Sequence, residues 1–357
     1  MVRKLDDSSF DKRYDCRQML AVLSRFSEQC RKALAIGAAF EPPQIDEIDK
    51  IVICAMGGSA LAGDIVKRFA TVPVFVHRNY GLPSFVDEMT LLIAVSYSGN
   101  TAETLSALNA GLKRRATVLC LSSGGVLKEI AQRESIPYLQ IPAEYQPRAA
   151  VGYLSLSLIN LLSQIGLVAG VDRLDCLPDE LKQTAAHCNP ARDIAENPAK
   201  ELAAKLAGKI PSIYGTQDNT EVVALRWKAQ INENAKQPAF WNVFPELNHN
   251  EIEGLLKSDL LPNQEILLLR NDYDRTENIA RIEIIKALFT NYGRSCTEIN
   301  ASGETEIGQI FSQIYLGDYV SVYLALLNEV DPTPVPLIEE FKQLLAEDKQ
   351  GSRHLGF

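Results

Sequence analysis

The sequence of 357 residues lacks the cysteine and histidine patterns that build disulfide frameworks or metal sites. Its seven cysteines are an odd number, they are scattered from Cys16 to Cys296, and no two of them form a C-x-x-C pair. Only four histidines occur, and they do not have the spacing of zinc ligands. We therefore expect a reduced, cytoplasmic protein that holds no metal.

Signals for nucleotides and nucleic acids are also missing. Neither G-x-G-x-x-G nor G-x-x-x-x-G-K-[ST] occurs at a junction between a strand and a helix, which argues against dinucleotide and nucleoside-triphosphate enzymes. The net charge is -9, and no basic run is longer than Lys113-Arg114-Arg115, which fits the end of a helix. An extended positive surface is therefore not expected, and we predict no cofactor and no nucleic-acid partner.

Membrane and targeting segments are not expected either. Asp6 and Asp7 stand where a signal peptide would be apolar. Residues 149–171 are long enough to cross a bilayer. They include polar side chains that lipid tolerates poorly, namely Ser155, Ser157, Asn160, Ser163 and Gln164. We interpret this segment as a helix buried on all sides in an α/β protein, and a membrane span is the less favoured alternative.

What the sequence does contain is a regular alternation of apolar runs and helical stretches from about residue 50 onward. This pattern predicts an α/β fold with mostly parallel sheets that helices cover on both faces. After a polar helical stretch with three prolines, the order strand, glycine, helix starts again, so the second half resembles a diverged copy of the first. We expect an N-terminal helical segment (1–40), a first domain (41–172), a helical connection (173–209), a second domain (210–330), and a C-terminal helix with a loose tail (331–357).

Two loops at predicted strand ends indicate a phosphate site. In the first, Gly57 and Gly58 would let the backbone approach a ligand, and Ser59 would cap the following helix. Alone, this loop also fits an ordinary turn. The second, Ser96-Tyr97-Ser98-Gly99-Asn100-Thr101, has more hydroxyls than a cap requires, and with backbone N–H groups they can bind a phosphate without lysine or arginine. Ligands of open α/β sheets bind beyond the carboxyl ends of the strands, so we predict a small phosphorylated metabolite as ligand.

The S-x-S-G-N-T loop, with G-G-S one strand earlier, resembles the sugar isomerase (SIS) domain. Further motifs occur along the chain in one order, namely Pro147-Arg148, Asn232-Glu233-Asn234, His249-Asn250-Glu251 and a C-terminal helix with Lys342. With them the sequence, over roughly residues 45–345, resembles the bifunctional phosphoglucose/phosphomannose isomerases. The resemblance implies two SIS-type domains, each a mostly parallel, doubly wound, flavodoxin-like sheet flanked by helices.

The resemblance also implies an activity, the metal-independent interconversion of glucose 6-phosphate, and of mannose 6-phosphate, with fructose 6-phosphate. After ring opening, a base must move a proton between C2 and C1, and another group must stabilise the cis-enediolate. The implied substrate- and phosphate-binding residues are Gly57, Gly58, Ser59, Ser96, Ser98, Thr101 and Pro147.

The resemblance places Glu233 at the position of the catalytic base. It lies late in a predicted helix, where the negative helix end and partial burial favour uptake of a proton by a carboxylate. Spacing alone would favour a solvated surface glutamate. Arg148 follows Pro147 in the first turn of a helix, where the helix dipole does not favour a cation. It is the candidate for stabilising the enediolate, and an ion pair with an acid is the alternative.

His249 is the candidate for ring opening, because an imidazole can shuttle a proton near neutral pH. The resemblance implies that this histidine comes from the neighbouring subunit, and hence a homodimer with a shared site. Lys342 matches a lysine that contacts the ring oxygen, although its spacing equally fits a surface position. Thr333 is a conceivable residue for accepting both C2 epimers, but the sequence does not place it.

Two other functions remain open at this point. One is another SIS-type isomerase, acting on a pentose 5-phosphate or an amino-sugar phosphate. The second is a regulator that senses a sugar phosphate without catalysis, although no effector domain is visible in the sequence.

Overall fold

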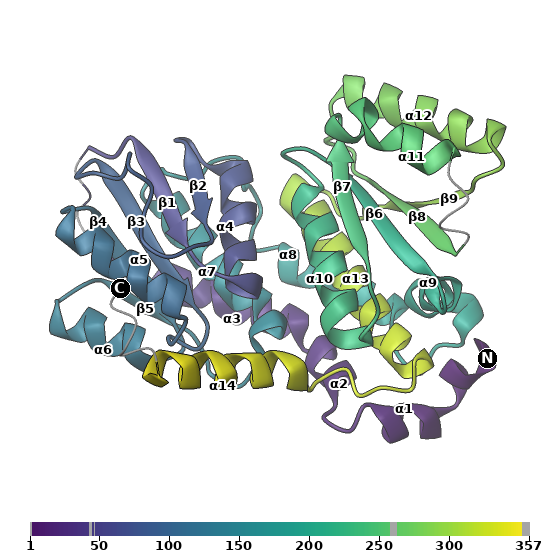
Figure 1. Cartoon of the computed structure of the whole chain (residues 1–357), viewed down its shortest axis with the longest axis horizontal. Helices are drawn as coiled ribbons and strands as arrows, with labels where there is room; N and C mark the ends of the chain where they lie inside the picture. Colours follow the sequence, from purple (N-terminus) through teal and green to yellow (C-terminus); the bar gives the residue numbers. More distant parts are fainter. Residues whose placement is uncertain (1, 43–44, 46, 258–262, 352–357) are drawn as a thin grey trace.

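The computed structural model describes residues 2–42, 45, 47–257 and 263–351. Most of the tail that we expected to be loose, residues 352–357, lies outside this range. The described chain folds into two α/β halves joined by a layer of helices (Figure 1). The prediction of an α/β fold with parallel sheets is confirmed.

The first half is a five-stranded parallel sheet with the strand order β2-β1-β3-β4-β5. The central strand β3 is buried at each of its seven positions, as expected of an apolar run covered on both faces. The strands are β1 (Lys50–Cys54), β2 (Val74–His77), β3 (Thr90–Ser96), β4 (Thr117–Ser122) and β5 (Tyr138–Gln140). The helices of this half are α4 (Gly57–Phe69), α5 (Ala102–Lys113), α6 (Gly125–Arg133) and α7 (Val151–Gln164).

The second half repeats this arrangement with four parallel strands in the order β7-β6-β8-β9, which matches β2-β1-β3-β4. Its strands are β6 (Ile210–Thr216), β7 (Phe240–Phe244), β8 (Gln264–Arg270) and β9 (Cys296–Asn300). Its helices are α10 (Glu221–Ala235), α11 (Glu251–Lys257), α12 (Thr276–Asn291) and α13 (Glu306–Leu327). The same strand order in both halves supports the interpretation that one half is a diverged copy of the other.

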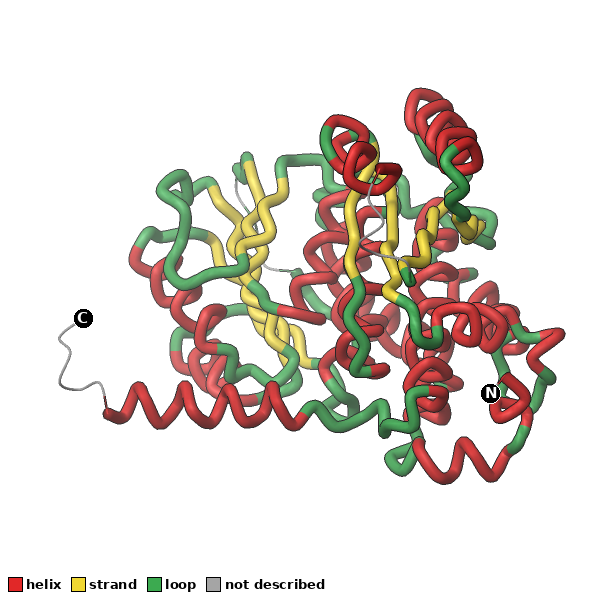
Figure 2. The backbone as a smooth tube through the Cα atoms, turned by 45° about the vertical axis from the view of Figure 1, so that its right-hand side comes forward, coloured by secondary structure: helices red, strands yellow, loops and turns green. Residues whose placement is uncertain are grey.

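Of the remaining helices, α8 connects the two halves, because it packs on both α3 and α13. Helix α3 packs on α7 of the first half, and α1 and α2 pack on α13 of the second. The helix α14 follows the second half in sequence, yet it lies along the first half in both views (Figure 1 and Figure 2). These helices are α1 (Ser8–Tyr14), α2 (Met19–Ser24), α3 (Phe26–Ala39), α8 (Leu177–His187), α9 (Pro198–Leu206) and α14 (Pro336–Gly351).

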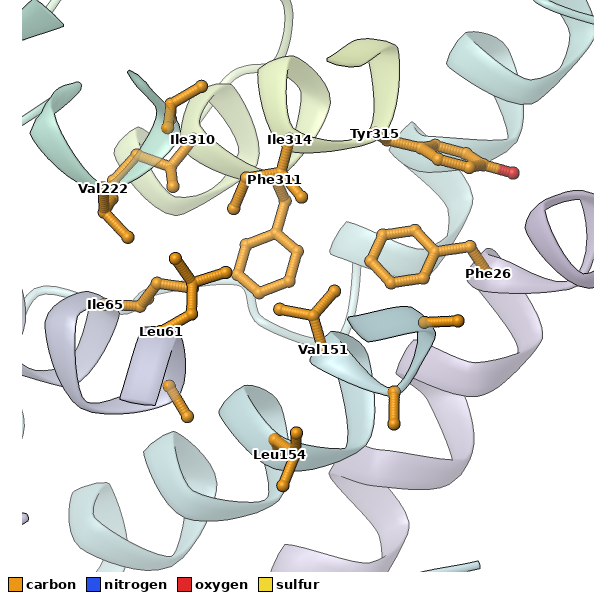
Figure 3. Close-up of a cluster of buried hydrophobic side chains, with 14 of the residues drawn as sticks. Phe26, Leu61, Ile65, Val151, Leu154, Val222, Ile310, Phe311, Ile314 and Tyr315 are labelled. Carbon is orange, nitrogen blue, oxygen red and sulfur yellow. The ribbon is translucent and has the colours of Figure 1, made fainter. Parts of the chain in front are cut away.

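One hydrophobic core spans both halves. Figure 3 shows Phe311 of α13 between Leu61 of α4 and Val151 of α7, with Phe26 of α3 beside them. Within the apolar segment 149–171, residues 151–164 form α7, whose side chains are nearly all buried, so the prediction of a buried helix is confirmed for this part. The helix ends at Gln164, and residues 165–171 are not helical. Among the described residues one helix, α13, is long and apolar enough to cross a membrane, and 94% of its most apolar stretch is buried inside the protein.

The contact between α10 and α13 depends on a glycine. Gly317 of α13 faces the indole of Trp227 in α10, and a Cβ atom at this position would lie 2.1 Å from Trp227 Nε1. The indole is buried, and its N–H donates to the carbonyl of Gln313 at 2.8 Å. Only a residue without a side chain lets the two helices approach this closely.

We predict that Gly317→Ala lowers the free energy of unfolding by about 1–3 kcal/mol, because the added methyl group overpacks the helix interface. The measurement is the midpoint of urea unfolding, followed by circular dichroism. Gly254→Ala in α11 is the matched control, since among the described residues no atom outside the helix's own backbone lies within 4 Å of a Cβ built there. Equal midpoints for Gly317→Ala and the wild type would contradict this account of the interface.

Candidate active site

The two loops predicted to bind phosphate lie side by side. Strands β1 and β3 are neighbours and parallel, so the loops that follow them share the carboxyl edge of the first sheet. Ser59 Oγ accepts a hydrogen bond from the backbone N–H of Tyr97 at 3.1 Å, which joins the two loops directly. Our expectation that Ser59 caps α4 is wrong, because the helix already begins at Gly57 and no side chain caps it.

The second loop forms a compact cluster of hydroxyl groups. Ser96 Oγ lies 2.8 Å from Thr101 Oγ1 and accepts from the N–H of Gly99 at 3.1 Å. Ser98 Oγ is exposed and accepts from the N–H of Asn100 at 3.2 Å. Within the described part of the chain, the hydroxyl hydrogens of Ser59 and Ser98 have no acceptor, so both can donate to a ligand. The N-termini of α4 and α5 open at this edge and add a partial positive charge.

Gly99 holds this loop against the next one. Its φ is +71°, and a Cβ atom there would lie 1.7 Å from the carbonyl oxygen of Gly124. Asn100 Oδ1 accepts from the N–H of Val126 at 3.0 Å, and the carbonyl of Gly99 accepts from Leu127 at 2.9 Å. The loop is therefore fixed before any ligand binds.

Arg148 approaches the first loop from the other side. It lies in the 3-10 turn η2 (Pro147–Ala149) that precedes α7. A Cβ atom on Gly58 would lie 3.2 Å from Arg148 Cα and 3.3 Å from the carbonyl oxygen of Pro147. The second glycine of the G-G-S loop is thus what allows the arginine to reach the phosphate-binding edge.

The Arg148 guanidinium is buried, and most of its donors are in use. Its Nε donates to Asn234 Oδ1 at 2.7 Å, and its Nη2 donates to the carbonyls of Pro332 (2.9 Å) and Thr333 (2.6 Å). Among the described residues its Nη1 has no hydrogen-bond partner, and it pairs with the Glu233 carboxylate, with 3.7 Å between Nη1 and Oε2. Burial lowers the pKa of Arg148, and the charge of Glu233 beside it acts in the opposite direction. One nitrogen of this guanidinium therefore remains able to bind a further oxygen atom.

The orientation of Arg148 is set by the interface between α10 and α13. Arg226 donates to the carbonyl of Arg148 at 2.9 Å and makes a buried two-point pair with Asp318, at 2.9 and 2.7 Å. Asn234 Nδ2 donates to Ser321 Oγ at 2.9 Å, which turns its oxygen toward Arg148. Sequence reasoning missed Arg226 and Asp318, although Asp318 is the only charged residue between Ile307 and Leu327.

Glu233 and His249 lie at opposite ends of β7. Glu233 is in the last turn of α10, just before β7, and its side chain is 30% exposed. His249 is exposed and ends η4 (Glu246–His249), which follows the carboxyl end of the strand. The five residues of β7 span about 16 Å. A single chain therefore does not bring these two candidates together.

Lys342 and Thr333 lie on the segment that leads away from Arg148. Thr333 is buried beside the guanidinium, and its hydroxyl has no hydrogen-bond partner among the described residues. Helix α14 begins three residues later, and Lys342 is exposed on it. The structure thus brings together five of the predicted parts of the site, namely Gly58, Ser59, the 96–101 loop, Arg148 and Glu233. It places Lys342 on an adjoining helix. His249 lies apart from them.

The arrangement of these residues suits both the binding of a phosphate and the transfer of a proton. A neutral site made of hydroxyls, N–H groups and helix N-termini suits a phosphate. Beside it, a carboxylate that can move a proton faces a fixed guanidinium nitrogen that can stabilise charge on an oxygen.

The chain is similar to several known sugar-phosphate isomerases. The family model described as "Bacterial phospho-glucose isomerase C-terminal SIS domain" matches residues 195–345. The bifunctional phosphoglucose/phosphomannose isomerase of Caldicellulosiruptor bescii is 42% identical over 335 residues, which cover 90% of this chain and 97% of that protein. The corresponding protein of Aquifex aeolicus is 34% identical over 300 residues, covering 83% and 90%.

Among solved structures, a hypothetical protein from Thermus thermophilus superposes with a TM-score of 0.73 at 16% identity, covering 97% of this chain and 94% of that one. At this low identity, the similarity shows a shared fold and nothing about function. The identity to the two isomerases over more than four-fifths of the chain goes further, and it shows that the chain belongs to the family of bifunctional phosphoglucose/phosphomannose isomerases.

Proposed function

We propose that the protein is an aldose–ketose isomerase that interconverts glucose 6-phosphate and mannose 6-phosphate with fructose 6-phosphate. The observation that carries this proposal is the pairing of Glu233 with the uncommitted Nη1 of Arg148 beside the hydroxyl-lined loop. The reaction needs these three parts, which are a phosphate anchor, a base and a group that stabilises an enediolate.

The phosphate is held at the carboxyl edge of the first sheet by Ser59 and by the loop from Ser96 to Thr101. With the phosphate fixed there, the other end of the open-chain sugar extends toward Glu233. Glu233 removes the proton from C2 and returns it to C1. Negative charge that develops on the sugar oxygens is stabilised by Arg148 Nη1, which is already in place, so little reorganisation is needed.

Acceptance of both aldoses follows from the intermediate. Glucose 6-phosphate and mannose 6-phosphate differ only in configuration at C2, and both give the same enediolate on losing the C2 proton. Thr333 is the residue that we propose for accommodating both. Its buried hydroxyl lacks a partner among the described residues, and its carbonyl binds Arg148.

Ring opening requires groups that we propose to come from two places. Lys342 of α14 would contact the ring oxygen, since the helix starts directly after the loop that holds Arg148. The proton shuttle would be His249 of the partner subunit, because His249 of the same chain is separated from Glu233 by the length of β7. The active form would then be a homodimer with shared sites.

Location and domain limits also belong to the proposal. All seven cysteines are free thiols, which is in keeping with a reducing cytoplasm. We assign the two SIS domains to residues 41–172 and 210–330. The first sheet falls within the former range and the second sheet within the latter.

The first test supplies fructose 6-phosphate in the presence of EDTA and measures glucose 6-phosphate and mannose 6-phosphate separately. We expect both products, and a loss of kcat on the order of 10³-fold in Glu233→Gln, because the amide cannot accept the proton. Glu221→Gln, at the opposite end of α10, is the control and should stay active. Glucose 6-phosphate alone would narrow the function to one aldose. Binding of the sugar phosphate by the wild type without any product would favour a sensor or another SIS-type isomerase.

Arg148→Lys tests the stabilising group. A lysine is a single-point cation and cannot satisfy Asn234 and the two carbonyls while leaving a donor for substrate. We expect kcat to fall by about 10²- to 10³-fold with a smaller change in KM. Unchanged kcat in Arg148→Lys would remove Arg148 from the mechanism.

Shared sites are tested by mixing subunits. We expect Glu233→Gln and His249→Asn each to be nearly inactive alone. After joint unfolding and refolding, about half of random dimers would be mixed, and each would contain one site with both native residues, so activity should return to about a quarter of the wild-type value. No recovery in dimers that assemble normally would argue that His249 acts within its own chain or not at all.

A further inference from the structure

Lys236 occupies a special position in the chain, directly after the helix that carries Glu233. It ends α10 in the left-handed conformation, with φ +53° and ψ +34°. Its ammonium group thereby turns back toward the last helical turn. There Nζ donates to the carbonyls of Glu233 (2.8 Å), Asp331 (3.0 Å) and Pro332 (3.2 Å).

One of these carbonyls is shared with the arginine of the site. The Pro332 oxygen accepts from both Lys236 Nζ (3.2 Å) and Arg148 Nη2 (2.9 Å). Lys236 thus joins the helix end that bears Glu233 to the loop that holds Arg148, two segments nearly a hundred residues apart in sequence. Lys236 therefore connects the segments that carry Glu233 and Arg148, whose Oε2 and Nη1 atoms face one another at 3.7 Å.

We propose that Lys236 is a positioning residue of the isomerase, which fixes the Glu233 carboxylate against the uncommitted Nη1 of Arg148. This inference rests on the proposed function. An ammonium group has three donors, and the three carbonyls use all of them, so none remains for a substrate. Lys236 therefore acts through Glu233 and Arg148 and does not contact the sugar.

The charge of the lysine suits its surroundings. The last carbonyls of α10 carry the negative end of the helix dipole, and the loop adds two more carbonyl oxygens. Lys236 is exposed as a residue, but its ammonium is the part that the loop covers. Burial and the charge of Arg148 lower the pKa of Lys236 to about 8, while Asp331 and Glu233 act in the opposite direction.

A dependence on pH follows. Below pH 8 the ammonium is protonated and makes three hydrogen bonds. Above pH 8 it loses a proton, so that one carbonyl is released and the attraction to all three weakens. The gap between Glu233 and Arg148 should then become less well defined, and kcat should fall on the alkaline side. The charged groups around Lys236 are Arg148 from η2, Glu233 from α10 and Asp331 from the loop.

The experiment compares Lys236→Met, Lys236→Arg and the wild type in isomerisation of fructose 6-phosphate between pH 6.5 and 9.5. Lys228→Met, on the same helix, is the matched control. We expect kcat of Lys236→Met to fall by about 10- to 100-fold, because a misplacement of about 1 Å has effects of this size. Its KM should stay within about twofold, since the phosphate loops lie in other segments. Lys236→Arg should recover most of kcat and lose the decline near pH 8.

A second variant keeps the test decisive if the methionine disturbs folding. In Lys236→Ala, added ethylammonium should raise kcat several-fold, whereas sodium at equal ionic strength should not. Wild-type kcat in Lys236→Met, or no recovery with either arginine or ethylammonium in folded variants, would overturn the inference. Failure of the proposed function is a separate outcome, because the wild type itself would then form no aldose 6-phosphate.

Discussion

The site depends on the burial of one guanidinium group. A buried cation is stable only if hydrogen-bond acceptors replace the water that it loses. For Arg148 these acceptors come from Asn234 and from two consecutive carbonyls, of Pro332 and Thr333. The side chain can keep its place only while η2, the end of α10 and the loop before α14 all stay where they are. The geometry that leaves Nη1 facing Glu233 is therefore a property of the whole fold.

The core explains why these segments stay in place. Helix α13 packs on α10, and the pair between Arg226 and Asp318 crosses that interface in a buried environment. Removing one partner of such a pair leaves an uncompensated charge, so the helices are held in one register. Arg226 also holds the backbone of Arg148, and Gly317 lets the two helices approach. The same contacts that stabilise the joint between the halves thus orient the site.

The two halves share a topology but use their carboxyl edges differently. In the first half the edge is lined by hydroxyls and N–H groups that can receive an anion. In the second half the buried carboxylate of Asp274 accepts from Thr216 Oγ1, from Asn219 Nδ2 and from the N–H of Asn271. At the carboxyl edge of the second sheet, a carboxylate of the chain itself therefore accepts these hydrogen bonds. The second half contributes to the site through the opposite end of its sheet, where the last turn of α10 carries Glu233.

The parts of the molecule that could be predicted from the sequence are those determined by residues close to one another along the chain. The parallel sheets follow from apolar runs, and the loop from Ser96 to Thr101 contains its own hydrogen-bond partners. The surroundings of Arg148 could not be predicted in this way, because its partners lie 86 and 184 positions away. The sequence left two explanations for an arginine in the first turn of a helix, a role at an oxyanion or an ion pair with an acid. The fold shows the ion pair, since Nη1 faces Glu233. The proposed mechanism assigns the role at the oxyanion to the same nitrogen.

The position of His249 bears on whether one chain can supply all the groups of the proposed reaction. Helix α10 runs back along its sheet, so a residue at its end and a residue after β7 must lie at opposite edges. No rearrangement of a short loop can bring them together, because β7 is paired along its whole length with β6. If both residues serve one reaction, they must come from different subunits. Activity would then require association, and the reason would lie in the topology of the second sheet.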